Sequence, residues 1–264
     1  MLHVKFILII GIRMITLQEL CAHLDHLLQP QSFKDYCYNG LQFEGKPEVL
    51  KIATGVSASL ATIQAAADSG ADALIVHHGL FWNQDSPQIY GSKKEKLQIL
   101  FNHNLSLIAY HLPLDAHQVV GNNWKAAEEM GWQNLEPFAP INGLYIGVCG
   151  RVNKMHRLKF QKKLEDFYEH SANVAFGGKE EIETVGLVSG GSYKIISEAI
   201  NRKLDCFIAG NFDEPVWNQA FEEKINFYAL GHSATERIGP RALGEYLSKE
   251  YKVEHQFIDI YNPF

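Results

Sequence analysis

The stretch Asp72-Ala73-Leu74-Ile75-Val76-His77-His78 (DALIVHH) decides the fold. Its continuous apolar run is typical of a strand that is covered on both faces of a parallel sheet. An apolar strand over 49–56 and a helical pattern over 57–68, ended by Gly70, precede it, and a third apolar run follows over 105–110. This alternation of strands and helices predicts an α/β fold with mostly parallel sheets and helices on both faces.

The second half of the chain repeats this pattern. Asp72 and the apolar run after it correspond to Asp205 and the run CFIA, 133 positions later. His111-x-x-x-Asp115 and His232-x-x-x-Glu236 correspond at an offset of 121, each directly after an apolar run. We therefore expect two similar α/β lobes related by a pseudo-twofold axis, over residues 14–140 and 141–264, with Pro137 and Pro140 marking the boundary. Ligands of such sheets bind at the carboxyl ends of the strands.

Composition and charge restrict the class of protein. The chain has 264 residues, of which 46% are hydrophobic and 20% charged, as in globular proteins. A net charge of −6 argues against non-specific nucleic-acid binding, although it leaves a local basic patch open. The four cysteines are widely spaced without a C-x-x-C motif, which favours reduced thiols and a cytoplasmic location.

The first residues of the chain contain a short apolar run ahead of the first predicted helix. The apolar run 6–12 (FILIIGI) is too short for a membrane-spanning helix, which needs about 20 residues, and no small-residue cleavage site follows it. Thr16 with Glu19 fits a capping box at the start of a helix over 17–28. We expect residues 1–13 to be a disordered or wrongly assigned extension, and we expect no membrane association.

The residues that carry chemistry lie at the ends of the predicted strands. They are four histidines and two carboxylates, namely His77, His78, His111, Asp115, His232 and Glu236. Nitrogen and oxygen donors without thiolates suit a catalytic site for zinc, iron or manganese. Neither G-x-S-x-G nor a P-loop motif occurs, and Ser189-Gly190-Gly191-Ser192 fits a plain strand–helix turn better than an anion site.

The histidine doublet adds a geometric constraint. Neighbouring side chains of a regular strand point to opposite faces, so His77 and His78 reach one ion only if the chain turns, which Gly79 would permit. Alternatively, each histidine binds a different ion of a pair about 3.5–4 Å apart. Both arrangements are open at this point.

Structural interpretations compete with the metal site. A single histidine at a strand end is usually a hydrogen-bonded structural residue, and we assign that role to the eight other histidines. Ser233-x-x-Glu236 fits a capping box, although Gly239-Pro240 favours a helix that starts at Pro240. Asp115 would equally cap a turn. Pro113 disfavours a helix through its preceding residue, so we expect a loop between His111 and Asp115.

Several motifs together resemble the NGG-interacting-factor-three-like family, whose members carry the name GTP cyclohydrolase I type 2 homologue. The stretches that carry the resemblance, which spans Met14 to the C-terminus, are DYCYNGLQ (35–42), HHGLF (77–81), HLPLDA (111–116), GHSATE (231–236) and FIDI (257–260). Gly79 stands where proline is usual, and Pro113 lies at a variable position; neither change removes a ligand. The chain resembles the short form of the family, which lacks an inserted domain.

The resemblance implies a dinuclear metal centre between two lobes and assembly into a toroidal homohexamer, a trimer of dimers. It places the ligands at His77, His78, Asp115, His232 and Glu236, with Glu236 as the bridge and His111 as a further histidine beside the metals. The resemblance leaves the two divalent metals open among Fe, Zn and Mn, and it does not identify the substrate.

Two functions remain open on these grounds. The first is a metal-dependent hydrolase that acts on a nucleotide-like or phosphoester substrate, with ring opening of GTP as one case and His111 as a proton shuttle. The second is a non-catalytic metal-binding scaffold whose ring binds a partner, including nucleic acid.

Overall fold

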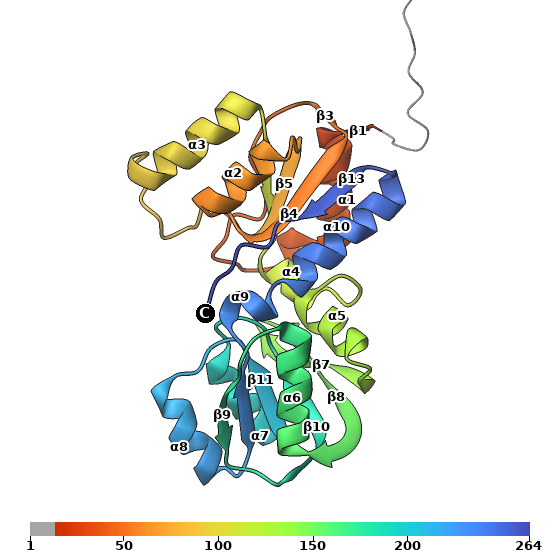
Figure 1. Ribbon diagram of the computed structural model, residues 1–264, viewed down its shortest axis with the longest axis vertical. Coiled ribbons are helices and arrows are strands. Elements are labelled where there is room, and N and C mark those ends of the chain that lie inside the picture. The colour runs from red at the N-terminus through yellow and green to blue at the C-terminus, as the bar shows by residue number, and fades with distance from the viewer. Residues whose placement is uncertain (1–13) are drawn as a thin grey trace, which may run out of the picture.

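The computed structural model describes residues 14–264, which form two α/β lobes stacked along the long axis of the molecule (Figure 1). The prediction for residues 1–13 lies outside the described residues. Each lobe contains one large sheet, and a short antiparallel pair, β1 (Ile15–Thr16) and β3 (Glu48–Val49), lies beside the first. The predicted two-lobe α/β architecture is therefore present.

The first sheet has five strands, four of them parallel. Their order is β13 (Glu254–Phe257), β4 (Lys51–Ser57), β5 (Ala73–His78), β6 (Ser106–Ala109) and the antiparallel edge strand β2 (Gly40–Phe43). The expected strand over 73–76 is confirmed and extends to His78. All but the last residue of β5 are buried, in agreement with its apolar sequence.

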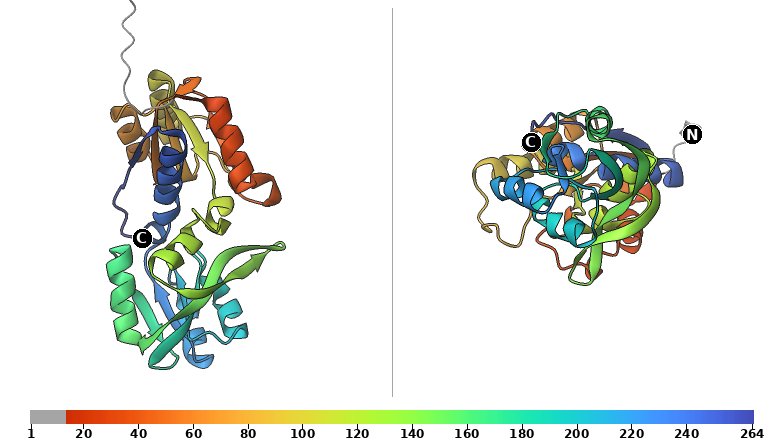
Figure 2. Two further views of the ribbon diagram at one scale, coloured as in Figure 1. Left: turned by 90° about the vertical axis from the view of Figure 1, so that its right-hand side faces the viewer. Right: turned by 90° about the horizontal axis from the view of Figure 1, so that it is seen from below.

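The second sheet has six strands around a parallel centre. Their order is β7 (Gln133–Ile141), β8 (Leu144–His156), β10 (Glu181–Leu187), β11 (Cys206–Ala209), β12 (Asn226–Ala229) and β9 (Asn173–Phe176). Only β10, β11 and β12 are mutually parallel, so this sheet is mixed. Pro137 and Pro140 lie within β7 and do not mark a break between lobes. The hairpin of β7 and β8 extends from the body of the lobe (Figure 2).

Helices cover both faces of each sheet (Figure 1). In the first lobe, α1 (Leu17–Leu28) and α10 (Ile238–Tyr251) pack on one face, and α2 (Leu60–Asp68) and α3 (Gly91–His103) pack on the other. In the second lobe, α6 (Arg157–Tyr168) lies opposite α7 (Ile196–Asn201) and α8 (Glu214–Glu222). The remaining helices lie near the waist and are α4 (Leu112–Ala116), α5 (Asn122–Glu129) and α9 (His232–Thr235), while 3₁₀ turns occur at Pro30–Ser32 and Tyr193–Ile195.

The same hydrogen-bonded unit occurs in both lobes. Asp72 accepts hydrogen bonds from the backbone N–H groups of Leu50 and Lys51, at 2.9 and 3.1 Å, and pairs with Lys46 at 2.7 Å. Asp205, 133 positions later, accepts hydrogen bonds from the backbone N–H groups of Glu183 and Thr184, at 3.0 and 2.9 Å, and pairs with Lys179 at 3.0 Å. The repeat read from the sequence is therefore a repeat of structure; the pseudo-twofold axis itself stays a prediction.

The C-terminal part of the chain departs from the predicted division at residue 140. Strand β13 pairs with β4, and α10 contributes Leu243 and Leu247 to the core of the first lobe. Residues 141–264 therefore do not all belong to the second lobe. The sequence did not indicate this because the last strand, EHQF, has no pattern that selects the edge of one sheet over the other.

Two local predictions have different outcomes. Thr16 and Glu19 form the expected capping box at α1. The expected loop between His111 and Asp115 is wrong, because Leu112–Ala116 forms α4 with proline in its first turn. The first turn of a helix tolerates proline because the N–H groups there have no partner within the helix. No helix over residues 14–264 is long and apolar enough to cross a membrane.

The repeated aspartate unit leads to a prediction on stability. Burial alone would raise the pKa of Asp72, but Lys46 and two backbone N–H groups outweigh it and hold the pKa below its ordinary value; Asp205 is held low in the same way. Asp72→Asn and Asp205→Asn should each lower the free energy of unfolding at pH 7 by about 1–3 kcal/mol. The difference from wild type should shrink as the pH falls below about 3.9, the ordinary pKa at which these carboxylates gain protons in the unfolded chain, and should vanish once the folded protein is protonated as well.

Urea denaturation at pH 7 and pH 3 measures this effect. The exposed Asp166, which pairs with Lys162 within one helix, provides the control Asp166→Asn, which should change stability little. Equal losses in the control and in the two buried variants would contradict the assignment.

Candidate metal centre

The carboxyl ends of the strands of both sheets face each other at the waist (Figure 1). Ion pairs and ring contacts bring all six candidate residues together. The first sheet brings the histidine doublet at the end of β5 and His111, two residues after the end of β6. The second sheet brings His232 and Glu236 after β12, on α9 and at its end. Asp115 lies in α4 between the lobes. The strand-end residues of the two sheets therefore lie together, as the sequence predicted.

Glu236 lies at the centre of the cluster and is only 3% exposed. Its Oε1 atom lies 3.1 Å from Nε2 of His232 and 3.5 Å from Nε2 of His77. Its Oε2 atom lies 3.3 Å from Nε2 of His78. Asp115 Oδ1 lies 3.7 Å from Nε2 of His77. The carboxylate of Glu236 therefore faces three imidazoles from two lobes.

The two neighbouring histidines face different oxygens of this one carboxylate. His77 lies nearest Oε1 and His78 nearest Oε2, and their ring centroids are 4.6 Å apart. Both histidines of the doublet therefore face the same carboxylate. The potential donor atoms form two overlapping groups, His77 with His78 and His111, and His78 with His232 and Glu236, each within 4.8 Å.

Outer hydrogen bonds fix the orientation of the three histidines from the first lobe. Each uses Nδ1 for a bond to the protein. His77 donates to the carbonyl of Tyr110 at 3.2 Å, His78 is bonded to Ser57 Oγ at 3.0 Å, and His111 is bonded to Asp35 Oδ1 at 2.8 Å. Such contacts leave Nε2 free and are typical of histidines that bind metals.

The donor set fits metal ions on two observations. His77 Nε2 and Glu236 Oε2 are buried and form no hydrogen bond within residues 14–264, although an unsatisfied buried polar atom is costly. The separations of 3.1–3.7 Å between Nε2 atoms and carboxylate oxygens exceed most hydrogen bonds. They match the spacing of about 3.4 Å between two ligands that share one tetrahedral ion. The buried His/Glu groups are therefore suited to hold metal ions.

The charges of the cluster act strongly on its members. Burial would lower the pKa of His77, but the carboxylates of Asp115 and Glu236 outweigh it and raise the pKa to about 9. Burial would raise the pKa of Glu236, yet His78 and His77 hold it well below its ordinary value. The cluster thus favours positive charge at its centre, which a divalent cation supplies.

Gly190 makes room for the central carboxylate. It adopts a left-handed conformation with φ +64°, and a Cβ atom there would collide with Glu236 Oε1. The N–H of Gly190 donates to Thr235 Oγ1 at 3.0 Å, and that of Ser189 donates to Asn123 Oδ1 at 2.7 Å. The turn over 189–192 thus supports the site, and two of its amides are already bonded, in agreement with the plain-turn interpretation.

The capping-box interpretation of Glu236 is wrong. The backbone N–H of Glu236 donates to the carbonyl of Ser233, and its side chain faces the three histidines instead of the start of a helix. Helix α10 begins at Ile238, two residues before the expected start at Pro240.

Of the eight histidines to which we assigned structural roles, His3 lies outside the described residues. The other seven lie outside the two donor groups. His255 is bonded to Thr54 Oγ1 at 2.9 Å, and His170 Nε2 is bonded to the carbonyl of Pro263 at 3.0 Å.

Sequence reasoning did not assign roles to the residues that support the ligands. Asp35 begins a stretch that carried the family resemblance, and it bonds both His111 Nδ1 and the N–H of Leu112. Burial would raise the pKa of Asp35, but His111 and further donors hold it far below its ordinary value. The apolar pattern contains no signal for this role because Asp35 lies 76 positions from the histidine that it contacts. Ser57 and Ser189, which lie 21 and 74 positions from the candidate ligands that they contact, were missed for the same reason. Asn122 was missed although it lies only 7 positions from Asp115.

Comparisons with known proteins now identify the family. Residues 15–263 match the family model Duf34/NIF3 (NGG1p interacting factor 3). The chain belongs to the Duf34/NIF3 family. A "GTP cyclohydrolase 1 type 2 homolog" of Chlamydia pneumoniae is 44% identical over 93% of this chain and 98% of that protein. A protein of the same name from Pseudomonas aeruginosa is 39% identical over 94% and 99% of the two chains.

Two solved structures share the fold along nearly their whole length. A structural-genomics protein called ybgI, of unknown function, is 36% identical with a TM-score of 0.90, over 95% of this chain and all of the other. TTHA1606 from Thermus thermophilus is 34% identical with a TM-score of 0.88, with the same coverage. The two-lobe fold predicted from the resemblance is confirmed.

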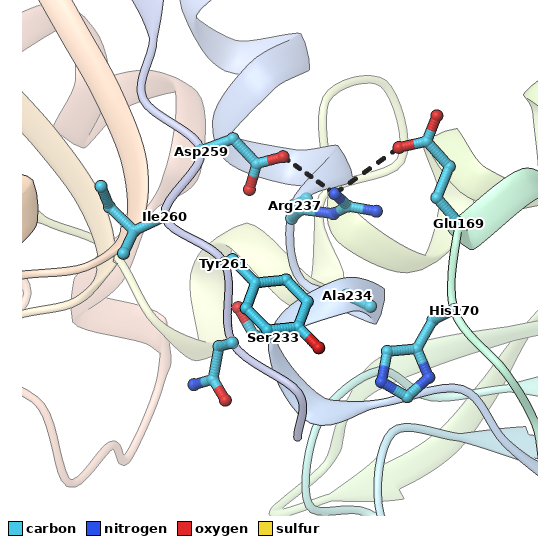
Figure 3. Close-up of a pocket in the computed structure, with 9 residues that line it drawn as sticks. Glu169, His170, Ser233, Ala234, Arg237, Asp259, Ile260 and Tyr261 are labelled. Atoms are coloured by element: carbon cyan, nitrogen blue, oxygen red, sulfur yellow. Dashed lines mark hydrogen bonds and ion pairs between the residues drawn. The ribbon is translucent and has the colours of Figure 1, made fainter.

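A polar pocket of about 140 Å³ lies on the outer side of α9 (Figure 3). Arg237, the residue after Glu236, crosses it and pairs with Asp259 at 2.9 Å and with Glu169 at 3.8 Å. The two carboxylates neutralise the guanidinium, so the pocket offers no free cation to an anionic ligand.

The geometry predicts that replacing a histidine inside the cluster weakens metal binding, whereas replacing a histidine outside it does not. His77→Ala should weaken the binding of divalent zinc or manganese by more than about 100-fold, because it removes a buried nitrogen donor. His255→Ala is the matched control, because His255 belongs to the same lobe and is also hydrogen-bonded. Titration calorimetry of metal-stripped protein measures both, and equal affinities in the two variants would refute the assigned cluster.

Proposed function

We propose that the protein is a dinuclear metal-binding protein that acts as a metal-dependent hydrolase on a nucleotide-like or phosphoester substrate. The observation that carries this proposal is the buried carboxylate of Glu236, whose two oxygens face different histidines of one doublet. A carboxylate in this position is suited to bridge two cations about 3.5–4 Å apart.

The ligands in this proposal are His77, His78, Asp115, His232 and Glu236. The metals are divalent Fe, Zn or Mn, since imidazole and carboxylate donors suit all three. Cations at such a centre polarise an electrophilic substrate and lower the pKa of water toward neutrality.

The residues of the chain supply the other requirements of hydrolysis. His111 is the proposed proton carrier, and Asp35 holds its Nδ1 atom at 2.8 Å so that the opposite nitrogen is available to the reaction. Trp82 lies with its ring centroid 5.2 Å from that of His111 and 5.9 Å from that of His78. It is thus an aromatic neighbour of both histidines.

The names of the relatives support the substrate class. The curated proteins from Chlamydia and Pseudomonas are called GTP cyclohydrolase 1 type 2 homologs, so ring opening of GTP is one reaction to test. Divalent cations at the centre would supply positive charge for the phosphates of an anionic nucleotide, which links the proposed substrate class to the metals. The four free cysteines favour a cytoplasmic location.

Turnover assays on protein of defined metal content test the proposal. With Fe, Zn or Mn bound, the wild-type protein should convert a member of a panel that contains GTP, other nucleotides and phosphoesters. Glu236→Gln should lower turnover by about 100-fold or more, because the variant loses the bridging charge. Glu245→Gln, at an exposed position of α10, is the control and should leave turnover unchanged.

Two outcomes separate the proposal from its competitor. Loss of turnover in Glu236→Gln alone supports the enzyme. A wild-type protein that binds metal but turns over no member of the panel, and that retains a protein or nucleic-acid partner with high affinity, supports a metal-binding scaffold instead.

The proposed assembly is a toroidal homohexamer built as a trimer of dimers, as the family resemblance implies. Light scattering should then give a mass of about 180 kDa, six times the 29.8 kDa of one chain. A mass of about 30 kDa across micromolar concentrations would refute the ring.

A further inference from the structure

One buried amide connects the two segments that carry the carboxylate ligands. Asn122, at the start of α5, has no exposed surface. Its Nδ2 atom donates to Asp115 Oδ1 at 2.9 Å, and its Oδ1 atom accepts from the N–H of Gly239 at 2.6 Å. Gly239 follows Glu236 by three residues. The side chain of Asn122 thus spans from one candidate ligand to the chain segment of the other.

Gly239 is shaped for this contact. A Cβ atom at position 239 would lie 2.6 Å from Asn122 Oδ1 and 2.9 Å from its Cγ, closer than van der Waals contact allows. The glycine therefore lets the start of α10 approach the amide directly. The close approach and the hydrogen bond both show that Asn122 packs directly against the start of α10.

A second donor meets the same carboxylate oxygen. Ser189 Oγ, from the second lobe, donates to Asp115 Oδ1 at 3.0 Å. The backbone N–H of Ser189 is itself held by Asn123 Oδ1 at 2.7 Å. Asp115 is therefore held by two buried donors, one from α5 and one from the turn after β10.

Residues 236–239, which lead from α9 into α10, are also held on the side away from Asn122. Arg237 donates to the carbonyl of Tyr168 and pairs with Asp259 and Glu169, as Figure 3 shows for the two carboxylates. Residues 236–239 are thus held from the outside by Arg237 and from the inside by Asn122. The carboxylate of Glu236 has little freedom to move relative to Asp115.

We propose that Asn122, together with Ser189, is a positioning residue that sets the separation of Asp115 and Glu236 and thereby the geometry of the metal pair. This inference rests on the proposed function of the site. Asn122 touches neither substrate nor metal in this role. It acts by directing two donors to one oxygen of Asp115 and by holding the backbone beyond Glu236.

A purely structural role would predict loss of stability alone, and Asn226 provides the matched control. Asn226 is also fully buried, and its Nδ2 atom donates to the carbonyls of Lys179 and Asp205, far along β12 from the site. Asn226→Ala and Asn122→Ala remove comparable buried amides. Only the second removes a contact to a candidate ligand.

Visible absorption of the cobalt-loaded, full-length protein provides the readout, since the spectrum of Co²⁺ reports the arrangement of its ligands. We expect Asn122→Ala to bind Co²⁺ about 10–100-fold more weakly than wild type and to show an altered spectrum. Ser189→Ala, which removes a single hydroxyl, should give a smaller change in the same direction. Asn226→Ala should lower the melting temperature and keep the wild-type spectrum.

The outcomes separate this inference from the proposed function. Wild-type affinity and spectrum in whichever of Asn122→Ala and Ser189→Ala folds would overturn the positioning role, as would equal losses in Asn226→Ala. A wild-type protein that binds no Co²⁺ would overturn the metal centre itself, and the positioning role with it.

Discussion

The structure depends on one buried carboxylate that must be balanced by groups from two lobes. Glu236 is 3% exposed, and burying a charge without partners is costly. Its partners cannot come from one strand, since His77 and His78 end β5 whereas His232 follows β12. The facing carboxyl ends of the two sheets, the collision-free turn at Gly190 and the crossing of α10 into the first lobe all serve this one meeting point.

The duplicated lobes make a single site because they differ at equivalent positions. Both retain the aspartate that organises the strand edge, Asp72 and Asp205. His77, however, corresponds to Gly210 in the second lobe. A Cβ atom at Gly210 would meet the carbonyl of Gly190 and the Cα atom of His232, so a histidine there would displace the turn and a ligand. The first lobe supplies the histidine doublet, and the second supplies the space for it and the carboxylate of Glu236 that faces it.

The sequence revealed the candidate metal ligands but not the residues that hold them in place, for a physical reason. Apolar strands are visible as local patterns, and the residues after them, such as His77 and Glu236, are placed by the rule that strand ends meet. Asp35 and Asn122 act through contacts 76 and 117 positions away, which no local pattern encodes. The crossing of β13 to β4 was missed likewise, because pairing partners of an edge strand are set by tertiary packing.

The metal centre and the joint between the lobes are built from the same residues. The chain crosses the waist through α4 and α5, through α9 into α10, and through the tail, where Phe264 accepts a hydrogen bond from the N–H of Ser233. Each crossing carries a ligand or contacts the segment of one. A cation bound by His77 and Glu236 would therefore link the lobes directly, and its binding free energy would add to the stability of their arrangement. The chemistry of this site is thus inseparable from the way in which the two lobes are held together.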